Sequence, residues 1–196
     1  MSVNINADTT NGLVLTSDTS GEIKLQSAGA DIATVTSSGI TMASGKVLAP
    51  TGPAFSAYPT NQQTLSSAVT TVVVLDAEEF DTANCFNNTG STVGGIPAYS
   101  FMPNVAGYYM FSTTVSNEVS VSSSRFIVIT QKNGIGGDRV FDYQNTGTFN
   151  APGTILYYLN GTTDYVTLSV YVAATTPKLN NLFSQTRFQG FLVRAA

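Results

Sequence analysis

The chain has 196 residues, of which 42% are hydrophobic and only 10% are charged, and its formal net charge is −4. That length can hold one ordinary domain plus an extension, with enough apolar residues to form a core. The eight lysines and arginines are scattered singly, which excludes the basic stripe that nucleic-acid binding requires. The longest apolar run is far too short to span a membrane, so we expect no membrane insertion.

The composition and the single cysteine indicate where the protein is made and used. A typical soluble domain is about 25% charged. Here serine, threonine, asparagine and glycine fill the surface instead, which suits a β-rich extracellular or virion protein. The first residues, MSVNINADTT, lack the basic and apolar regions of a signal peptide. Cys85 is the only cysteine, which excludes an intrachain disulfide and a thiolate metal cage. We therefore expect synthesis in a reducing host cytoplasm without classical secretion.

The N-terminal part, residues 1–52, differs from the rest of the chain. Short apolar pieces alternate with glycine-containing turns, and each piece is predicted to be a strand of about three or four residues. The pieces are Leu13–Leu15, Ile23–Leu25, Ile32–Val35, Ile40–Met42 and Val47–Leu48. A lone chain has no second layer against which to bury them. The part is therefore either a flexible tail or a segment that folds by wrapping around identical copies, and the regular glycine turns favour the intertwined form.

A domain boundary is predicted at Ala49–Pro53, where two prolines and a glycine interrupt any regular element. Residues 53–196 follow as a series of predicted strands, and no window shows helical periodicity with caps. The fold class is therefore all-β, a sandwich or jelly roll. The clearest predicted strands are Val69–Leu75, Arg125–Gln131, Ile155–Leu159, Tyr165–Val172 and Arg187–Val193, with a hairpin turn at Lys132–Gly134. In Tyr165–Val172, alternation predicts that one aliphatic row enters the core: Val166, Leu168, Val170 and Val172.

Two predicted strands carry bulky apolar side chains on both faces. In Tyr108–Val115, alternation places Tyr109 and Phe111 on one face and Tyr108 and Met110 on the other. The last strand, Arg187–Val193, also carries bulky side chains on both faces, with Phe188 and Phe191 on opposite sides. A sheet that is apolar on both surfaces must contact a second body, and a closed homo-oligomer is the usual solution.

Several segments in order resemble the globular head of complement component C1q and the related tumour necrosis factor jelly roll. They are PAFSAY (53–58), VVVLDAEEFDTANCF (72–86), FMPNVAGYYMFSTTVS (101–116), FIVITQKNG (126–134), TILYYLNGTTDYVTLSVYV (154–172) and RFQGFLV (187–193). The resemblance implies that TILYYL and YVTLSVYV form a strand pair joined by a turn. The chain departs from the family at the inserted residues 160–164 of that turn, where the family usually has Gly-Asp, and in the Asn- and Thr-rich stretch 173–185. The N-terminal part resembles the β-turn arrays of bacteriophage fibre proteins.

The resemblance implies a homotrimer, because members of this family form three-fold trimers in which one sheet of each jelly roll packs around the axis. Under this interpretation the candidates for axial packing are Tyr109, Phe111, Tyr157 and Phe191. The alternative is that each of these residues belongs to the ordinary core of one protomer.

No convincing catalytic or cofactor site is present in the sequence. The chain has no histidine, the commonest general base and metal ligand, and no lysine adjoins a serine nucleophile. Cys85 is predicted to be a small core residue, and Gly134–Gly137 to be a hairpin turn instead of a phosphate loop. The acidic cluster Asp76, Glu78, Glu79 and Asp81 is predicted to lie in a loop, either as solvated charges or as a calcium site. We expect neither an enzyme nor a bound cofactor.

These features together predict a bacteriophage virion protein, a trimeric fibre or spike with an outward jelly-roll head. The N-terminal segment would bind other virion proteins, and loops at the far end of the head would bind a host-surface glycan or protein. The alternative is a capsid cement or decoration protein that stabilises the shell.

Overall fold

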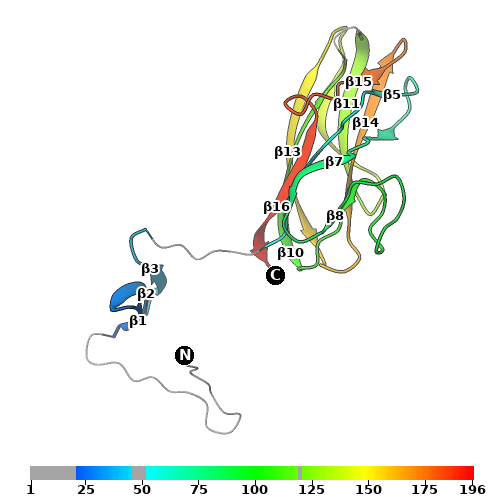
Figure 1. Ribbon diagram of the computed structural model, residues 1–196. Coiled ribbons are helices and arrows are strands. Elements are labelled where there is room, and N and C mark those ends of the chain that lie inside the picture. The colour runs from blue at the N-terminus through cyan, green and yellow to red at the C-terminus, as the bar shows by residue number, and fades with distance from the viewer. Residues whose placement is uncertain (1–20, 46–51, 119–120) are drawn as a thin grey trace. The chain divides into compact units, whose positions relative to one another are not determined.

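The structure is a computed structural model that describes residues 21–45, 52–118 and 121–196, where the regular elements are all strands (Figure 1). The chain divides into two compact units, Met1–Pro50 and Thr51–Ala196, close to the predicted boundary after residue 52. The pieces predicted at residues 13–15 and 47–48 lie outside the described residues. No helix in the described ranges is long and apolar enough to cross a membrane.

The N-terminal unit contains a small antiparallel sheet with strand order β1-β2-β3. Its strands are β1 (Ile23–Ser27), β2 (Ala30–Thr36) and β3 (Gly39–Met42). Ala28 and Gly29 form the first turn with φ of 51° and 78°, the left-handed backbone that a tight two-residue hairpin requires. The three pieces predicted in this range therefore form strands that pair within one chain, and intertwining with other chains stays a prediction.

The C-terminal unit is a sandwich of two antiparallel sheets (Figure 1). The first has the order β13-β10-β16-β4-β7. Its strands are β4 (Ala54–Tyr58), β7 (Ala77–Asp81), β10 (Gly107–Ser116), β13 (Asn150–Leu159) and β16 (Arg187–Ala195). We call the face of this sheet that meets the other sheet its inner face, and the opposite one its outer face.

The second sheet has the order β12-β11-β14-β9-β8, and β6 also pairs with β14. Its strands are β6 (Thr71–Val72), β8 (Phe86–Asn87), β9 (Ser100–Phe101), β11 (Ser123–Lys132), β12 (Asp138–Tyr143) and β14 (Val166–Ala174). A separate two-stranded sheet joins β5 (Gln63–Thr64) to β15 (Lys178–Leu179).

Three local expectations need correction. The predicted strand Val69–Leu75 pairs with β14 only at β6 and through the Val73 N–H, because the side chain of Gln63 takes the Val72 carbonyl and the Val74 N–H. The acidic segment predicted as a loop is the strand β7. The segments on either side of residues 160–164 are not paired with each other, since β13 and β14 belong to different sheets and the connection crosses between them.

The core between the sheets is built on stacked aromatic rings. Phe55 stacks on Phe86 and Phe101 at centroid distances of 4.9 and 4.6 Å, and meets Phe188 edge-on at 5.1 Å. The second sheet contributes the aliphatic row predicted on β14, which is fully buried: Val166, Leu168, Val170 and Val172. Cys85 lies in the same core with 2% of its surface exposed, as predicted.

Gly190 on β16 is a requirement of this packing. A Cβ atom at that position would lie 2.7 Å from the ring of Phe111 and 3.0 Å from the ring of Phe55. Any larger residue would push these rings apart, which explains the small residue between Gln189 and Phe191.

The connection between β13 and β14 is tied to the β11–β12 turn by Asp164. Its carboxylate accepts hydrogen bonds from the Asn133 side chain at 2.8 Å and the Asn160 backbone at 3.1 Å, and pairs with Lys132 at 2.9 Å. Partial burial raises the pKa of Asp164, but these hydrogen bonds and the lysine lower it by more, so the net pKa lies below its ordinary value of 3.8.

Asp164→Asn is therefore expected to lower the free energy of unfolding at pH 7 by about 1.5–3 kcal/mol, the usual contribution of hydrogen bonds to a charged group. Because folding lowers the pKa of Asp164, its interactions stabilise the protein only while the carboxylate is ionised. The difference between parent and variant should shrink below about pH 4, the unfolded-state pKa of aspartate. Urea unfolding of both proteins at pH 7 and about pH 3 measures this difference in the free energy of unfolding. An equal difference at both pH values would contradict a stabilising role for the ionised Asp164 carboxylate.

Candidate functional site

Two of the four candidates for axial packing belong to the core of a single protomer. Tyr109 and Phe111 lie on the inner face of β10, and both side chains are 0% exposed. The Tyr109 hydroxyl donates to the Val105 carbonyl at 2.7 Å, and burial raises the pKa of Tyr109 to about 12. Neither side chain can line an axis, because the opposite sheet already covers both. The alternative of ordinary core packing holds for these two residues.

Tyr157 on β13 also points between the sheets. Its hydroxyl donates to the Asp138 carboxylate at 2.6 Å and lies 2.9 Å from the Thr130 hydroxyl, so it links the two sheets. Burial, together with the acceptor Asp138, raises the pKa of Tyr157 to about 12. Tyr157 therefore also packs inside the protomer and does not reach the outer face.

Phe191 differs from the other three, because it lies on the outer face and is 53% exposed. In the register of the sheet it stands beside Met110 on β10 and Ala54 on β4, and Met110 stands beside Leu156 on β13. Larger apolar and aromatic side chains continue around this row. We call the group the outer patch, and its members are Phe80, Tyr108, Met110, Leu156, Tyr158, Phe191 and Val193.

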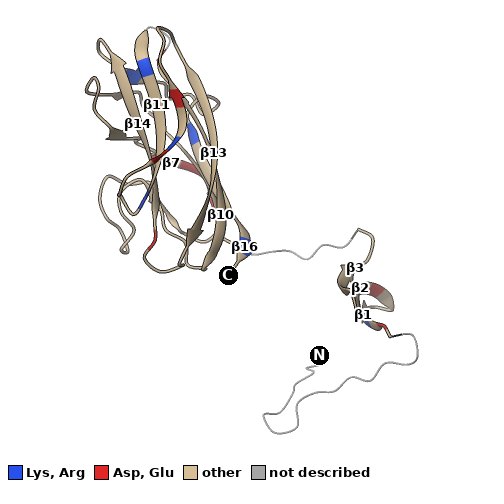
Figure 2. Ribbon diagram, turned by 180° about the vertical axis from the view of Figure 1, so that it is seen from behind, with Lys and Arg blue, Asp and Glu red and all other residues tan. Residues whose placement is uncertain are grey.

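The members of the outer patch are uncharged and largely in contact with solvent, and Arg194 stands beside Tyr108 at the edge of the patch. Leu156 is 50% exposed and Val193 54%, and the rings of Tyr108 and Tyr158 pack edge to face with centroids 5.6 Å apart. Charged residues are few on the strands of this unit (Figure 2). An apolar surface of this kind is typical of an interaction site, because exposing contiguous apolar area to water is unfavourable.

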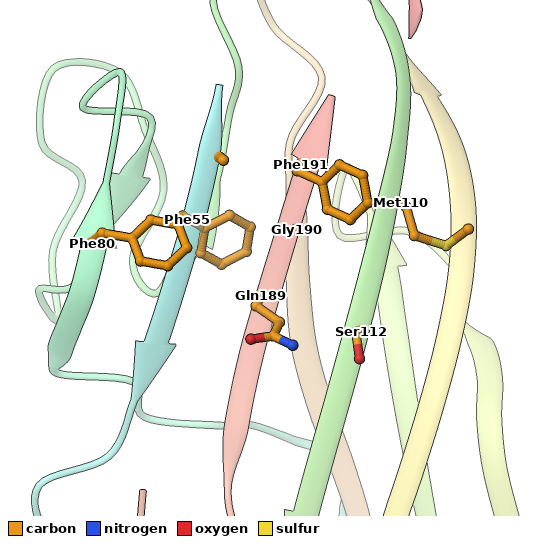
Figure 3. Close-up of a pocket in the computed structure, with 8 residues that line it drawn as sticks. Phe55, Phe80, Met110, Ser112, Gln189, Gly190 and Phe191 are labelled. Carbon is orange, nitrogen blue, oxygen red and sulfur yellow. The ribbon is translucent and has the colours of Figure 1, made fainter. Parts of the chain in front are cut away.

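A pocket of about 240 Å³ opens within the patch (Figure 3). Phe80, Phe191 and Met110 form apolar walls, while Gln189 and Ser112 lie together on one side and supply polar groups. The full lining is Ala54, Phe55, Phe80, Met110, Ser112, Gln189, Gly190 and Phe191. Its walls suit a large apolar side chain that ends in a polar group.

The acidic cluster does not form a joint site. The Asp76 carboxylate accepts two hydrogen bonds from Thr60 at 2.6 Å, while Asp81 accepts the backbone N–H of Phe86 at 2.7 Å. Glu79 lies 3.8 Å from Arg187. Partial burial, helped by Asp81, raises the pKa of Glu78. Within the part of the chain that is described, no three acidic, histidine or cysteine side chains are grouped to hold a metal ion.

The comparisons with known proteins identify the class of fold. No family model and no curated protein matches the sequence. Among solved structures, murine APRIL is similar with a TM-score of 0.52 and 14% identity, over 72% of this chain and 99% of that one. Eiger TNF from S. frugiperda is similar with a TM-score of 0.51 and 9% identity, over 74% of this chain and 94% of that one.

These similarities show that the sandwich is a jelly roll of the tumour necrosis factor type. At such low identities they establish the fold and no more. The fibre-like character of the N-terminal part stays a prediction.

Proposed function

We propose that the protein is a homotrimer that self-associates through the outer patch. The observation that carries this proposal is the outer patch itself, a half-exposed group of neighbouring uncharged side chains on one face of a sheet, with Arg187 and Arg194 only at the ends of that face. The resemblance to the C1q and tumour necrosis factor families supports three-fold closure, since it implies that one sheet packs around the axis. The pocket beside Phe191 can bind a side chain of a neighbouring protomer. A few side chains buried in such pockets contribute most of the binding energy of an interface.

The role that we propose for this trimer is a virion structural protein, a fibre or spike whose head binds a host-surface glycan or protein. The low charge, the single buried cysteine and the glycine-punctuated N-terminal strands support this role. The three heads of one trimer would bind a surface with higher avidity than a single head, which binds it weakly.

Two experiments test this role. An antibody against the head should label the surface of particles in electron micrographs, and particles without label would contradict a virion location. The purified protein should also bind host cells. Binding to particles that lack the protein, with no binding to cells, would contradict adhesion and identify a decoration protein instead.

A further inference from the structure

The small N-terminal sheet has one face that is apolar except for Ser27 at its end. Its register pairs Ile23 with Val35 and Val35 with Ile40, and pairs Leu25 with Ala33 and Ala33 with Met42. Residues that are directly opposite in a ladder share a face of the sheet. The face is therefore lined by Ile23, Leu25, Ala33, Val35, Ile40 and Met42, and we call it the N-terminal apolar face.

Polar and charged side chains gather on the opposite face. The register also pairs Lys24 with Thr34 and Thr34 with Thr41. An irregularity in the ladder between Leu25 and Gln26 brings Asp31 to the same side, where it accepts a hydrogen bond from Gln26 at 2.6 Å and pairs with Lys24 at 3.5 Å. A bulge of this kind reverses the side on which the following residues point. Among the residues that are paired in the register, the ionic groups thus lie on the face opposite the N-terminal apolar face, and Ile32 is the residue that the bulge leaves unpaired.

The N-terminal apolar face is only partly covered in this unit, since Ile23, Val35 and Met42 are half-buried. Leu25 is 50% exposed and Ile40 is 68% exposed, while Ala33 is buried. The strands have only 5, 7 and 4 residues. Such a sheet needs a second layer against its apolar face to be stable, because one layer cannot remove that face from water.

We infer that the N-terminal apolar face packs against the same face of the other copies in the homotrimer. Identical faces can approach each other closely here, since the ionic groups lie on the opposite side and no like charges meet. In the sequence, residues 46–51 connect each sheet to its head. The inference rests on the proposed function in one respect: the trimer of heads brings three sheets together at high effective concentration.

This arrangement gives the protein two separate self-association surfaces in one chain, the outer patch on the head and the N-terminal apolar face. Residues such as Lys24 and Asp31 then form the outside of the assembled N-terminal part. That ionic surface would be the one presented to other virion proteins.

Neighbouring residues on opposite faces provide a matched test. Ile40 and Thr41 are both exposed in the single chain, and Cys85 is 2% exposed, so it reacts little. Full-length Ile40→Cys and Thr41→Cys proteins are treated with a short bismaleimide crosslinker and separated on a denaturing gel. We expect several-fold more crosslinked dimer for Ile40→Cys than for Thr41→Cys and the parent protein. Leu25→Cys and Thr34→Cys form a second pair, should either first variant fold poorly.

The outcomes separate this inference from the proposed function. If the protein sediments as a trimer but Ile40→Cys and Leu25→Cys crosslink no more than their partners, the inference is wrong and another segment, such as residues 1–20, covers the face. If the protein sediments as a monomer, the proposed function fails. A monomer has no neighbouring copy against which the face could pack, so that result would overturn the inference as well, whereas a trimer without preferential crosslinking overturns the inference alone.

Discussion

Replacing Phe111 with alanine is expected to lower the free energy of unfolding by about 3–5 kcal/mol, the usual cost of removing a buried phenylalanine ring. The side chain is 0% exposed. It stacks on Phe188 with centroids 5.5 Å apart and contacts the rings of Phe101 and Tyr157 at 5.8 and 6.0 Å. The cavity cannot close easily, because these neighbours are held by both sheets. Urea denaturation followed by circular dichroism measures the loss.

Leu182→Ala is the control for this experiment. Leu182 is 53% exposed and lies outside the outer patch, so its replacement should change the free energy of unfolding by less than about 0.5 kcal/mol. A loss below about 1 kcal/mol for Phe111→Ala would contradict its place in the core.

Replacing Leu156 with aspartate is expected to separate the trimer into folded monomers. Leu156 lies in the outer patch beside Met110 and is 50% exposed in the single chain, so the protomer can tolerate a charge there. In the trimer the same carboxylate would be buried without a partner. We expect a cost of at least about 3 kcal/mol, or about a hundredfold in the association constant. Sedimentation velocity measures the assembly, and circular dichroism checks the fold.

Ile135→Asp is the matched control, because Ile135 is 80% exposed in the β11–β12 turn and does not belong to the outer patch. It should stay trimeric. A Leu156→Asp protein that remains a trimer, or an Ile135→Asp protein that dissociates to the same degree, would show that the outer patch is not the interface.

The alternation of β10 could be predicted from the sequence, but the face that forms the core could not. Both faces carry aromatic rings, and period two alone does not say which one meets the second sheet. Tyr109 and Phe111 are therefore candidates both for the axis and for the core, and the structure places both of them inside the protomer. The β14 row presented no such ambiguity, because its two faces differ sharply in polarity.

The same limit applies to the rest of the outer patch. Tyr157 is a candidate for axial packing from the sequence, but the structure turns it inward, and its neighbours Leu156 and Tyr158 lie on the outer face of β13. The alternation of β13 did offer both choices, because it places Leu156 and Tyr158 on one face and Tyr157 on the other. Phe80 was missed because its segment was predicted to be a loop. Its strand, β7, depends on pairing with β4, a contact that local sequence does not reveal.

Sedimentation velocity of the unmodified full-length protein at micromolar concentration tests the central claim most directly. We predict a single species with three times the mass of the 20.6 kDa chain. A stable species with the mass of one chain would contradict self-association through the outer patch.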